Sequence, residues 1–237
     1  MVSISYSHRP NGDWVFDDEV AKCFDHMLKT SVPMYDEMIR SIFSIISQNN
    51  FSCKPDNGSM LDLGCGTATT LKELACLSTG HSVVGIDSSE SMVKIARENT
   101  EHLSNASIYC QSVTDPFPDK RLYGTVLSVL TLMFIPPLDR LKVLKMCHDR
   151  LDDNGIMFVV EKCETNFDED IIVPIYHLWK MSQGYSKKSI ENKSSSLKGV
   201  LVPFSAWENE VMFKQAKFKS EIFFAHHMFR GWILKKG

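Results

Sequence analysis

The sequence predicts one doubly wound α/β domain built on a mostly parallel sheet. Three observations support this fold class. Apolar strands alternate with helical patterns between residues 60 and 160, a glycine turn follows the first strand, and two further strands form an antiparallel hairpin near the end of the sequence. Such alternation is typical of a parallel sheet covered by helices on both faces. A chain of 237 residues can bury a sizeable core as a single domain.

Residues 1–58 are predicted to form an N-terminal arm and a helical cap. The arm, residues 1–18, is irregular and carries an aromatic pair among acidic residues. One helical pattern covers residues 19–29. A second has Pro33 in its first turn and runs to about residue 47, with apolar residues along one stripe. A linker rich in proline, asparagine and glycine follows.

Residues 59–163 are predicted to form a nucleotide-binding core. The five expected strands span residues 60–63, 83–86, 107–110, 125–130 and 156–160. The expected helices span residues 69–77, 91–100 and 138–151, and a turn is expected at residues 153–155.

Residues 164–237 are predicted to supply substrate-side helices and the terminal hairpin. Helices are expected at residues 171–183 and 208–217, a polar helix or loop at 187–196, and strands at 220–225 and 228–234. His226 and His227 join these strands. We expect their side chains to point in opposite directions, which does not favour a metal site.

Composition disfavours several classes of function. The formal net charge is −3 and there is no basic stripe, so direct binding of nucleic acid is not expected. The seven cysteines form neither a C-x-x-C pair nor a zinc-binding pattern, which predicts reduced thiols, a cytoplasmic location and no metal. No apolar run reaches the roughly 18 residues of a membrane span, so no membrane contact is expected.

The strongest functional signal is a glycine turn paired with an acidic strand end. Gly64 and Gly66 close an apolar strand and let the backbone approach a ligand where a Cβ atom would collide. Asp87 ends the next strand, where a carboxylate can accept hydrogen bonds from both hydroxyls of a ribose. Asp62 precedes the turn and suits a ligand with an amino group and a sulfonium, whereas it would repel a pyrophosphate. The pattern therefore favours S-adenosylmethionine (SAM) over NAD.

The segments DLGCGTA and VVGIDSSESMVKIARE resemble motifs I and II of the class I SAM-dependent methyltransferases, which have a Rossmann-like fold with a seven-stranded sheet. NGDWVFDDEVAKCFDHMLKTSVPMYDEM and GYSKKSIENK resemble one branch, the carboxy-S-adenosylmethionine synthases, which supply a modified cofactor for wobble-uridine modification in tRNA. With the glycine turn and Asp87, the predicted cofactor-binding set is Tyr35, Asp62, Gly64, Cys65, Gly66, Asp87, Ser88, Met92, Ser112, Val113 and Ser128. Val129 is an alternative to Ser128, and the resemblance also implies a homodimer.

The sequence departs from this branch at three positions. The arginine that holds the extra carboxylate of the carboxylated cofactor is replaced by Ser194, which follows Lys193. A hydroxyl does not replace a bidentate guanidinium, and a lysine binds as a point charge with a different reach. Ser112 stands in place of an acid, and the asparagine expected at the end of the fourth strand is absent.

Candidate catalytic residues are His177 as a general base and Tyr176 as a group that orients the substrate. Ser194 and three residues at strand ends, Thr131, Met133 and Glu161, are predicted to face the substrate. Glu161 and Lys162 are adjacent and point in different directions, so at most one of them is expected to be functional.

Three functions are compatible with these residues. The first is methyl transfer from SAM to a small-molecule acceptor, with S-adenosylhomocysteine (SAH) as the product. The second is formation of carboxy-SAM from SAM and prephenate. The third is a non-catalytic SAM-binding partner protein.

Overall fold

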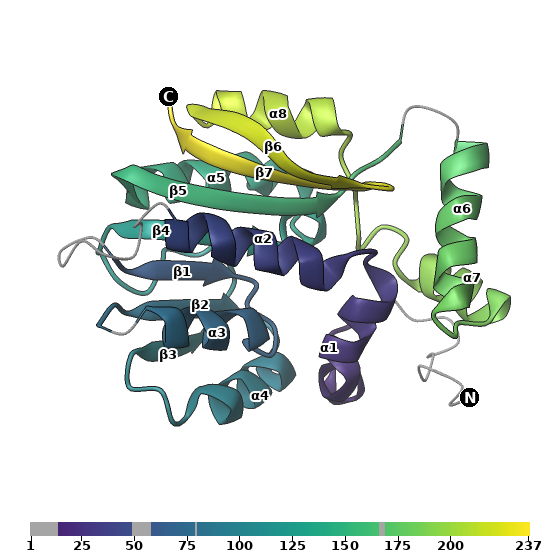
Figure 1. Ribbon diagram of the computed structural model, residues 1–237, viewed down its shortest axis with the longest axis horizontal. Helices are drawn as coiled ribbons and strands as arrows, with labels where there is room; N and C mark the ends of the chain where they lie inside the picture. The colour runs from purple at the N-terminus through teal and green to yellow at the C-terminus, as the bar shows by residue number, and fades with distance from the viewer. Residues whose placement is uncertain (1–13, 49–57, 79, 166–168) are drawn as a thin grey trace.

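The computed structural model describes residues 14–48, 58–78, 80–165 and 169–237. Its centre is a seven-stranded sheet with the order β3-β2-β1-β4-β5-β7-β6, which confirms the predicted fold class (Figure 1). Strands β1 to β5 are parallel, and the final pair is antiparallel. The predicted arm up to residue 13 and the linker from 51 to 57 lie outside the described residues. Among the described residues, no helix has both the length and the apolar character needed to cross a membrane.

The helical cap consists of two helices, as predicted: α1 (Asp18–Ser31) and α2 (Tyr35–Gln48). Pro33 is not in the first turn of α2 but in the turn before it, because Met34 has a φ of 57°. Asp17 caps α1, because its carboxylate accepts hydrogen bonds from the backbone N–H groups of Glu19 and Val20. The apolar stripe of α2 is buried against the sheet.

The core alternates strands and helices. It contains β1 (Met60–Leu63), α3 (Thr69–Leu77), β2 (Val83–Asp87), α4 (Glu90–Thr100), β3 (Ala106–Cys110), β4 (Tyr123–Val129), the 3₁₀ helix η1 (Leu132–Phe134), α5 (Pro137–Arg150) and β5 (Leu151–Lys162). The chain order reverses between β1 and β4, and open α/β sheets bind ligands beyond the carboxyl ends of their strands at such a point.

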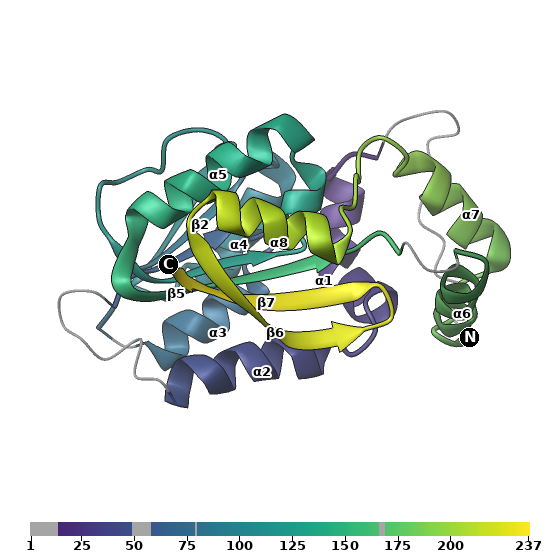
Figure 2. The same cartoon turned by 90° about the horizontal axis from the view of Figure 1, so that it is seen from above.

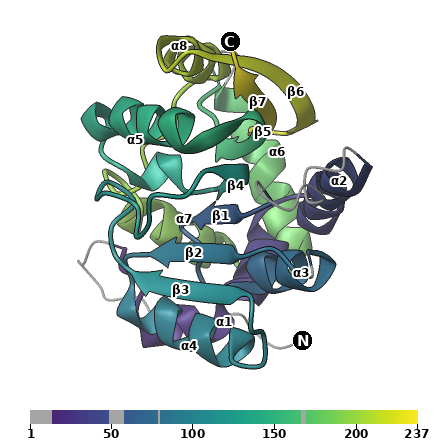
Figure 3. The same ribbon diagram turned by 90° about the vertical axis from the view of Figure 1, so that its left-hand side faces the viewer.

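Helices cover both faces of the sheet, as Figure 3 shows edge-on. One apolar core lies under α2 and α3, and the other lies under α5 and α8 (Ala206–Gln215). The central strand β1 is buried along its whole length. Its carboxyl end is therefore held rigidly, which suits a binding site.

The last third supplies α6 (Glu169–Ser182), α7 (Lys187–Ser196), α8 and the hairpin of β6 (Phe218–His226) and β7 (Phe229–Lys236). The segment predicted as a polar helix or loop at 187–196 is thus a helix. Figures 1 and 2 show α6 and α7 together to one side of the sheet. They are joined to α1, because the Tyr176 hydroxyl donates to the Ser31 carbonyl oxygen (2.5 Å) and the Tyr185 hydroxyl lies 3.0 Å from Thr30 Oγ1.

Two other local predictions need correction. Strand β5 includes the turn expected at residues 153–155. These residues still form an irregular part of the strand. The Asp152 side chain accepts a hydrogen bond from the Asn154 N–H, and the pairing of β5 with β4 shifts register there. The rings of His226 and His227 do not point apart. Their centroids are 4.5 Å apart, since the chain turns at His227, where φ is 47°.

Candidate functional site

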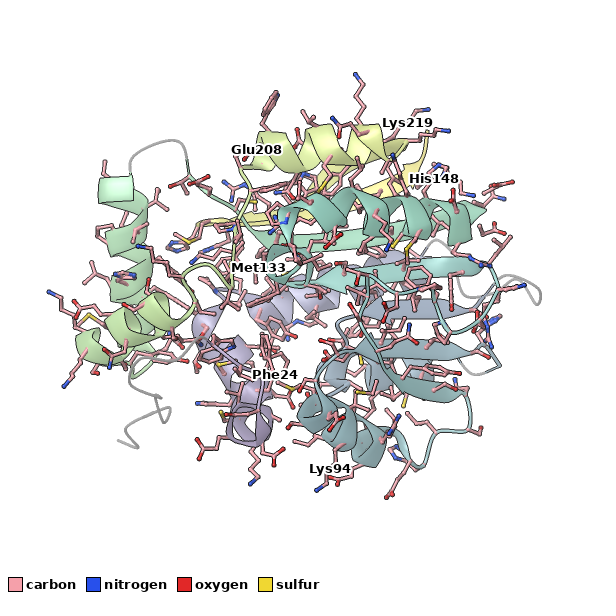
Figure 4. The ribbon with its side chains drawn as sticks, turned by 180° about the vertical axis from the view of Figure 1, so that it is seen from behind. Phe24, Lys94, Met133, His148, Glu208 and Lys219 are labelled. Carbon is pink, nitrogen blue, oxygen red and sulfur yellow. The ribbon has the colours of Figure 1, made fainter. Side chains whose placement is uncertain are left out.

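A cavity of about 830 Å³ lies at the carboxyl ends of the parallel strands. The sheet, residues 14 and 16 of the arm, and the helices α1, α6 and α7 all contribute to its walls. Met133 on η1 and Phe24 on α1, both labelled in Figure 4, line it from the sheet and from the helical cap. Most of the predicted site residues also line it: Tyr35, Asp62, Gly64, Cys65, Gly66, Asp87, Ser88, Met92, Ser112, Val113, Thr131, Met133, Tyr176, His177 and Ser194.

The glycine turn has the conformation that its sequence predicts. Gly64 has φ of 67° and Gly66 has φ of 55°, in the left-handed region that favours glycine. A Cβ atom at Gly64 would lie 2.5 Å from Thr131 Oγ1, and one at Gly66 would lie 2.7 Å from the Phe24 ring. The turn therefore exposes bare backbone to the cavity.

A methyl group at Gly64 tests this constraint. We expect Gly64→Ala to lower the free energy of unfolding by about 2 to 4 kcal/mol, because a left-handed alanine adds to a collision with Thr131. Gly199→Ala is the matched control. Gly199 also has a positive φ of 82°, but a Cβ atom there would have no neighbouring heavy atom within 4 Å, so only the smaller backbone cost is expected. Equal losses in urea unfolding experiments would contradict the collision.

Asp87 holds the glycine turn at Gly66. One carboxylate oxygen accepts from the Gly66 N–H (2.9 Å) and the other from the Ser89 N–H (2.8 Å). A carboxylate has about four acceptor positions, so two remain for a ligand diol. Ser89, and not Asp87, is the N-cap of α4. Asp87 thus connects the glycine turn to the next helix and lines the cavity.

Asp62 is a buried acid at the same cavity. Burial, together with the charge of Asp87, raises the pKa of Asp62 to about 7. A ligand ammonium group beside Asp62 would stabilise its charged form. The glycine turn, Asp87 and Asp62 therefore line one cavity, as the prediction of a SAM site requires.

Three lysines from different elements line the opposite part of the cavity: Lys162 at the end of β5, Lys180 on α6 and Lys193 on α7. The ammonium groups of Lys162 and Lys180 lie 5.4 and 5.5 Å from the ring centroid of Tyr176. Lys193 Nζ lies 5.1 Å from the Trp14 ring centroid and 3.4 Å from Ser31 Oγ. We call these three residues the lysine cluster.

The lysine cluster concentrates positive charge in a desolvated place. Burial and the charge of Lys162 lower the pKa of Lys180 to about 8, and burial with the charges of Lys180 and Lys162 lowers that of Lys193 to about 7. Burial also lowers the pKa of Lys162. Within the described residues, no salt bridge links Lys162 or Lys180 to a carboxylate. The cluster therefore suits an anionic ligand.

The depressed pKa of Lys193 predicts a pH-dependent effect on stability. Between about pH 7 and 10.5 the unfolded chain binds a proton that the folded chain does not bind, so this lysine makes stability rise with pH. We expect Lys193→Met to stabilise the ligand-free protein, and the gain to shrink by about 1.4 kcal/mol per pH unit. Urea unfolding of both proteins at several pH values measures this difference. The exposed Lys188→Met is the control, and a gain that does not vary with pH would contradict the prediction.

Comparisons with known proteins identify the family of the chain. A methyltransferase domain model matches residues 60–155. The carboxy-S-adenosyl-L-methionine synthase of Campylobacter fetus is 37% identical over 209 residues, covering 86% of each chain, and that of Helicobacter hepaticus is 35% identical, covering 93% of this chain and 94% of the relative. The chain belongs to the carboxy-S-adenosyl-L-methionine synthase family. It is a SAM-dependent enzyme, and its cofactor is SAM.

Solved structures agree on the fold. The DhpI–SAH complex has a TM-score of 0.63 at 16% identity and covers 93% of both chains. Magnesium protoporphyrin IX methyltransferase from Synechocystis PCC 6803, solved with bound SAH, has a TM-score of 0.62 at 14% identity and covers 92% of this chain and 94% of that one. These likenesses show the class I methyltransferase fold.

Two predicted site residues of this family member do not line the cavity. Ser128 is fully buried in β4, and its neighbour Val129 lines the cavity instead. Glu161 is 2% exposed, and its carboxylate accepts hydrogen bonds from the backbone of Leu132 and Met133. Glu161 therefore faces the loop beside the cavity and does not face the substrate space, whereas the adjacent Lys162 does.

The candidate catalytic residues have different surroundings. His177 lines the cavity, and burial together with the charges of Lys180 and Lys162 lowers its pKa, which favours the neutral imidazole. A neutral imidazole can accept a proton. The Tyr176 hydroxyl donates to the Ser31 carbonyl oxygen, and the Tyr176 ring lies near the ammonium groups of Lys162 and Lys180.

Two further parts of the site were not predicted from the sequence. One is the described end of the arm, where Trp14 and Phe16 line the cavity: the backbone N–H of Trp14 donates to the Ser196 carbonyl oxygen (3.0 Å), and the Ser89 hydroxyl donates to the Phe16 carbonyl oxygen (2.6 Å). Lys180 is the other part. A local signal for it existed, because it follows Tyr176 by four residues and so shares a helix face with it.

Proposed function

We propose that this enzyme transfers the methyl group of SAM to a small acceptor that carries a carboxylate or a similar anionic group. The observation that carries this proposal is the lysine cluster, which lines the same cavity as the glycine turn and Asp87. SAM supplies a methyl group on a positively charged sulfur. Lys162 and Lys180 are desolvated and form no salt bridge to a carboxylate within the described residues, so an anionic ligand would stabilise them, which supports an anionic acceptor.

Different residues of the cavity would bind the cofactor, bind the acceptor and accept a proton. Asp87 and the glycine turn hold the cofactor, and the lysine cluster holds the anionic end of the acceptor, so that the two reactants are aligned. His177 is the residue that we propose to accept a proton from the acceptor. Thr131, Met133 and Phe134 form a wall that limits access of water.

A second candidate is the formation of carboxy-SAM from SAM and prephenate. The names of the relatives support it, and so does the position of Lys193, whose buried side chain lines the cavity beside Ser194. A lysine lacks the bidentate geometry of arginine, but it supplies positive charge at this point.

One incubation separates the candidates. The protein is mixed with SAM and with prephenate or a panel of other small carboxylates, and the adenosyl products are identified by mass spectrometry. Methyl transfer gives SAH together with a methylated acceptor. Carboxy-SAM synthesis gives a cofactor heavier by one carboxylate, and only with prephenate. SAM that is bound but unchanged in every mixture would contradict both candidates.

We also infer a homodimer in the cytosol. The family resemblance supports the dimer, and so does an exposed apolar face of α6 formed by Ile171, Ile175, Leu178 and Met181. Light scattering of the purified protein tests the dimer, and a monomeric mass would contradict it.

A further inference from the structure

We propose that Glu161 and Arg140 act as positioning residues: together they clamp the wall of the cavity formed by residues 131–135 and 201–203. Neither residue lines the cavity. Both have ionisable side chains and are almost completely buried, with 2% and 1% of their surfaces exposed. We call this pair the wall clamp.

Glu161 holds the first half of the wall. One carboxylate oxygen accepts from the Leu132 N–H (2.9 Å) and the other from the Met133 N–H (2.7 Å). These groups belong to η1, a single turn of 3₁₀ helix whose first N–H groups have no partner within the helix. The carboxylate thus fixes the start of a segment that has few hydrogen bonds of its own.

Arg140 holds the second half of the wall. Its guanidinium donates to the carbonyl oxygens of Ile135 (2.9 Å), Met133 (3.3 Å) and Val202 (2.7 Å), and it lies 4.3 Å from the ring centroid of Phe204. One planar group therefore joins the end of η1 to the connection between α7 and α8.

The clamped segments face both ligands. Thr131, Met133 and Phe134 line the cavity from the first segment, and Leu201 and Pro203 line it from the second. The Thr131 hydroxyl donates to the Leu63 carbonyl oxygen (2.8 Å), next to the glycine turn. A shift of this wall would therefore change the space in which cofactor and acceptor meet.

The residue just before the wall, Leu130, has a backbone conformation that its surroundings must hold in place. Leu130 has a φ of 59°, a conformation that is uncommon for a bulky residue and that persists only where the surroundings hold it in place. Burying two ionisable groups carries a desolvation cost, and well-packed apolar residues of similar size would stabilise the fold as well or better. Directed hydrogen bonds to the backbone specify one conformation of the wall, which apolar packing alone would not do.

The substitution Glu161→Gln tests the clamp with little change of shape. A glutamine can accept from only one of the two N–H groups, because its amide nitrogen is a donor. We expect hydrogen exchange of the Leu132 and Met133 amides to become at least about tenfold faster. Turnover should fall by about 10- to 100-fold in kcat, since a misplaced wall spoils the alignment of the reactants. The dissociation constant of SAM should change by less than about threefold, because Asp87 and the glycine turn remain.

Asp119→Asn is the matched control. Asp119 also accepts a backbone hydrogen bond, from the Arg121 N–H, but it lies just before β4 at the amino end of the sheet. This variant should leave both the exchange at η1 and kcat unchanged. Arg140→Lys, which keeps the charge, should loosen the Val202 segment and so increase exchange of the Val202 amide, which donates to the Met133 carbonyl oxygen (2.9 Å), while Glu161 still protects Leu132.

The exchange measurement needs no substrate, so the clamp and the proposed function can fail separately. The inference rests on the proposed function only for its effect on turnover. Unchanged exchange in Glu161→Gln overturns the clamp, and so does faster exchange with an unchanged kcat. Faster exchange in a protein that forms no product with any acceptor supports the clamp and contradicts the proposed function.

Discussion

Replacing Asp87 by alanine is expected to raise the dissociation constant of SAM by at least about 100-fold. Each hydrogen bond between a charged group and a ligand contributes about 1.5 to 3 kcal/mol, and Asp87 has two acceptor positions left for the ribose diol. The substitution also removes the acceptor of the Gly66 N–H and so loosens the glycine turn. Calorimetric titration with SAM measures the loss.

Glu90→Ala is the control for this prediction. Glu90 is an exposed acid in the first turn of α4, close to Asp87 in the chain, and it does not line the cavity. Its removal changes the net charge equally but should leave the affinity for SAM within about threefold. Tight binding of SAM by Asp87→Ala would contradict the assignment of the ribose site.

Removing a cation of the lysine cluster is expected to reduce activity and to increase stability. We expect Lys180→Met to lower kcat/KM for the anionic substrate by about 30- to 100-fold, which corresponds to the loss of one charge-assisted hydrogen bond. The dissociation constant of SAM should stay within about threefold. Methionine also removes the cost of desolvating Lys180, so the midpoint of thermal unfolding without ligand should rise.

Lys188→Met separates a specific loss from a general change of charge. Lys188 is exposed on α7, near the cluster in sequence but outside the cavity. It should keep both the activity and the midpoint of the wild type. A Lys180→Met enzyme with full activity would show that the anionic group binds elsewhere.

The fold was predictable because its signals are local. The period of the apolar residues identified the seven strands and most of the helices, whereas polar α7 stayed a helix or a loop and η1 was not predicted. The glycine turn with the strand-end acid predicted the cofactor crevice. Ser128 shows the limit of such reasoning. The sequence left Ser128 and Val129 as alternatives, and because successive side chains of a strand point to opposite faces, only one of them, Val129, lines the cavity.

The lysine cluster was not predictable in the same way. Lys162, Lys180 and Lys193 come from β5, α6 and α7, and only the packing of α6 and α7 against α1 brings them together. Glu161 illustrates the same limit. Its position after a strand predicted a residue facing the crevice, but its partners are backbone groups of a segment 28 and 29 residues away in the chain.

A crystal structure of the protein with SAM and an anionic substrate tests the central claim most directly. We expect ribose hydroxyls on the Asp87 carboxylate, the methionine tail along residues 64 to 66, and the anionic group among Lys162, Lys180 and Lys193. A sugar bound away from Asp87, or an anionic group far from all three lysines, would contradict the claim.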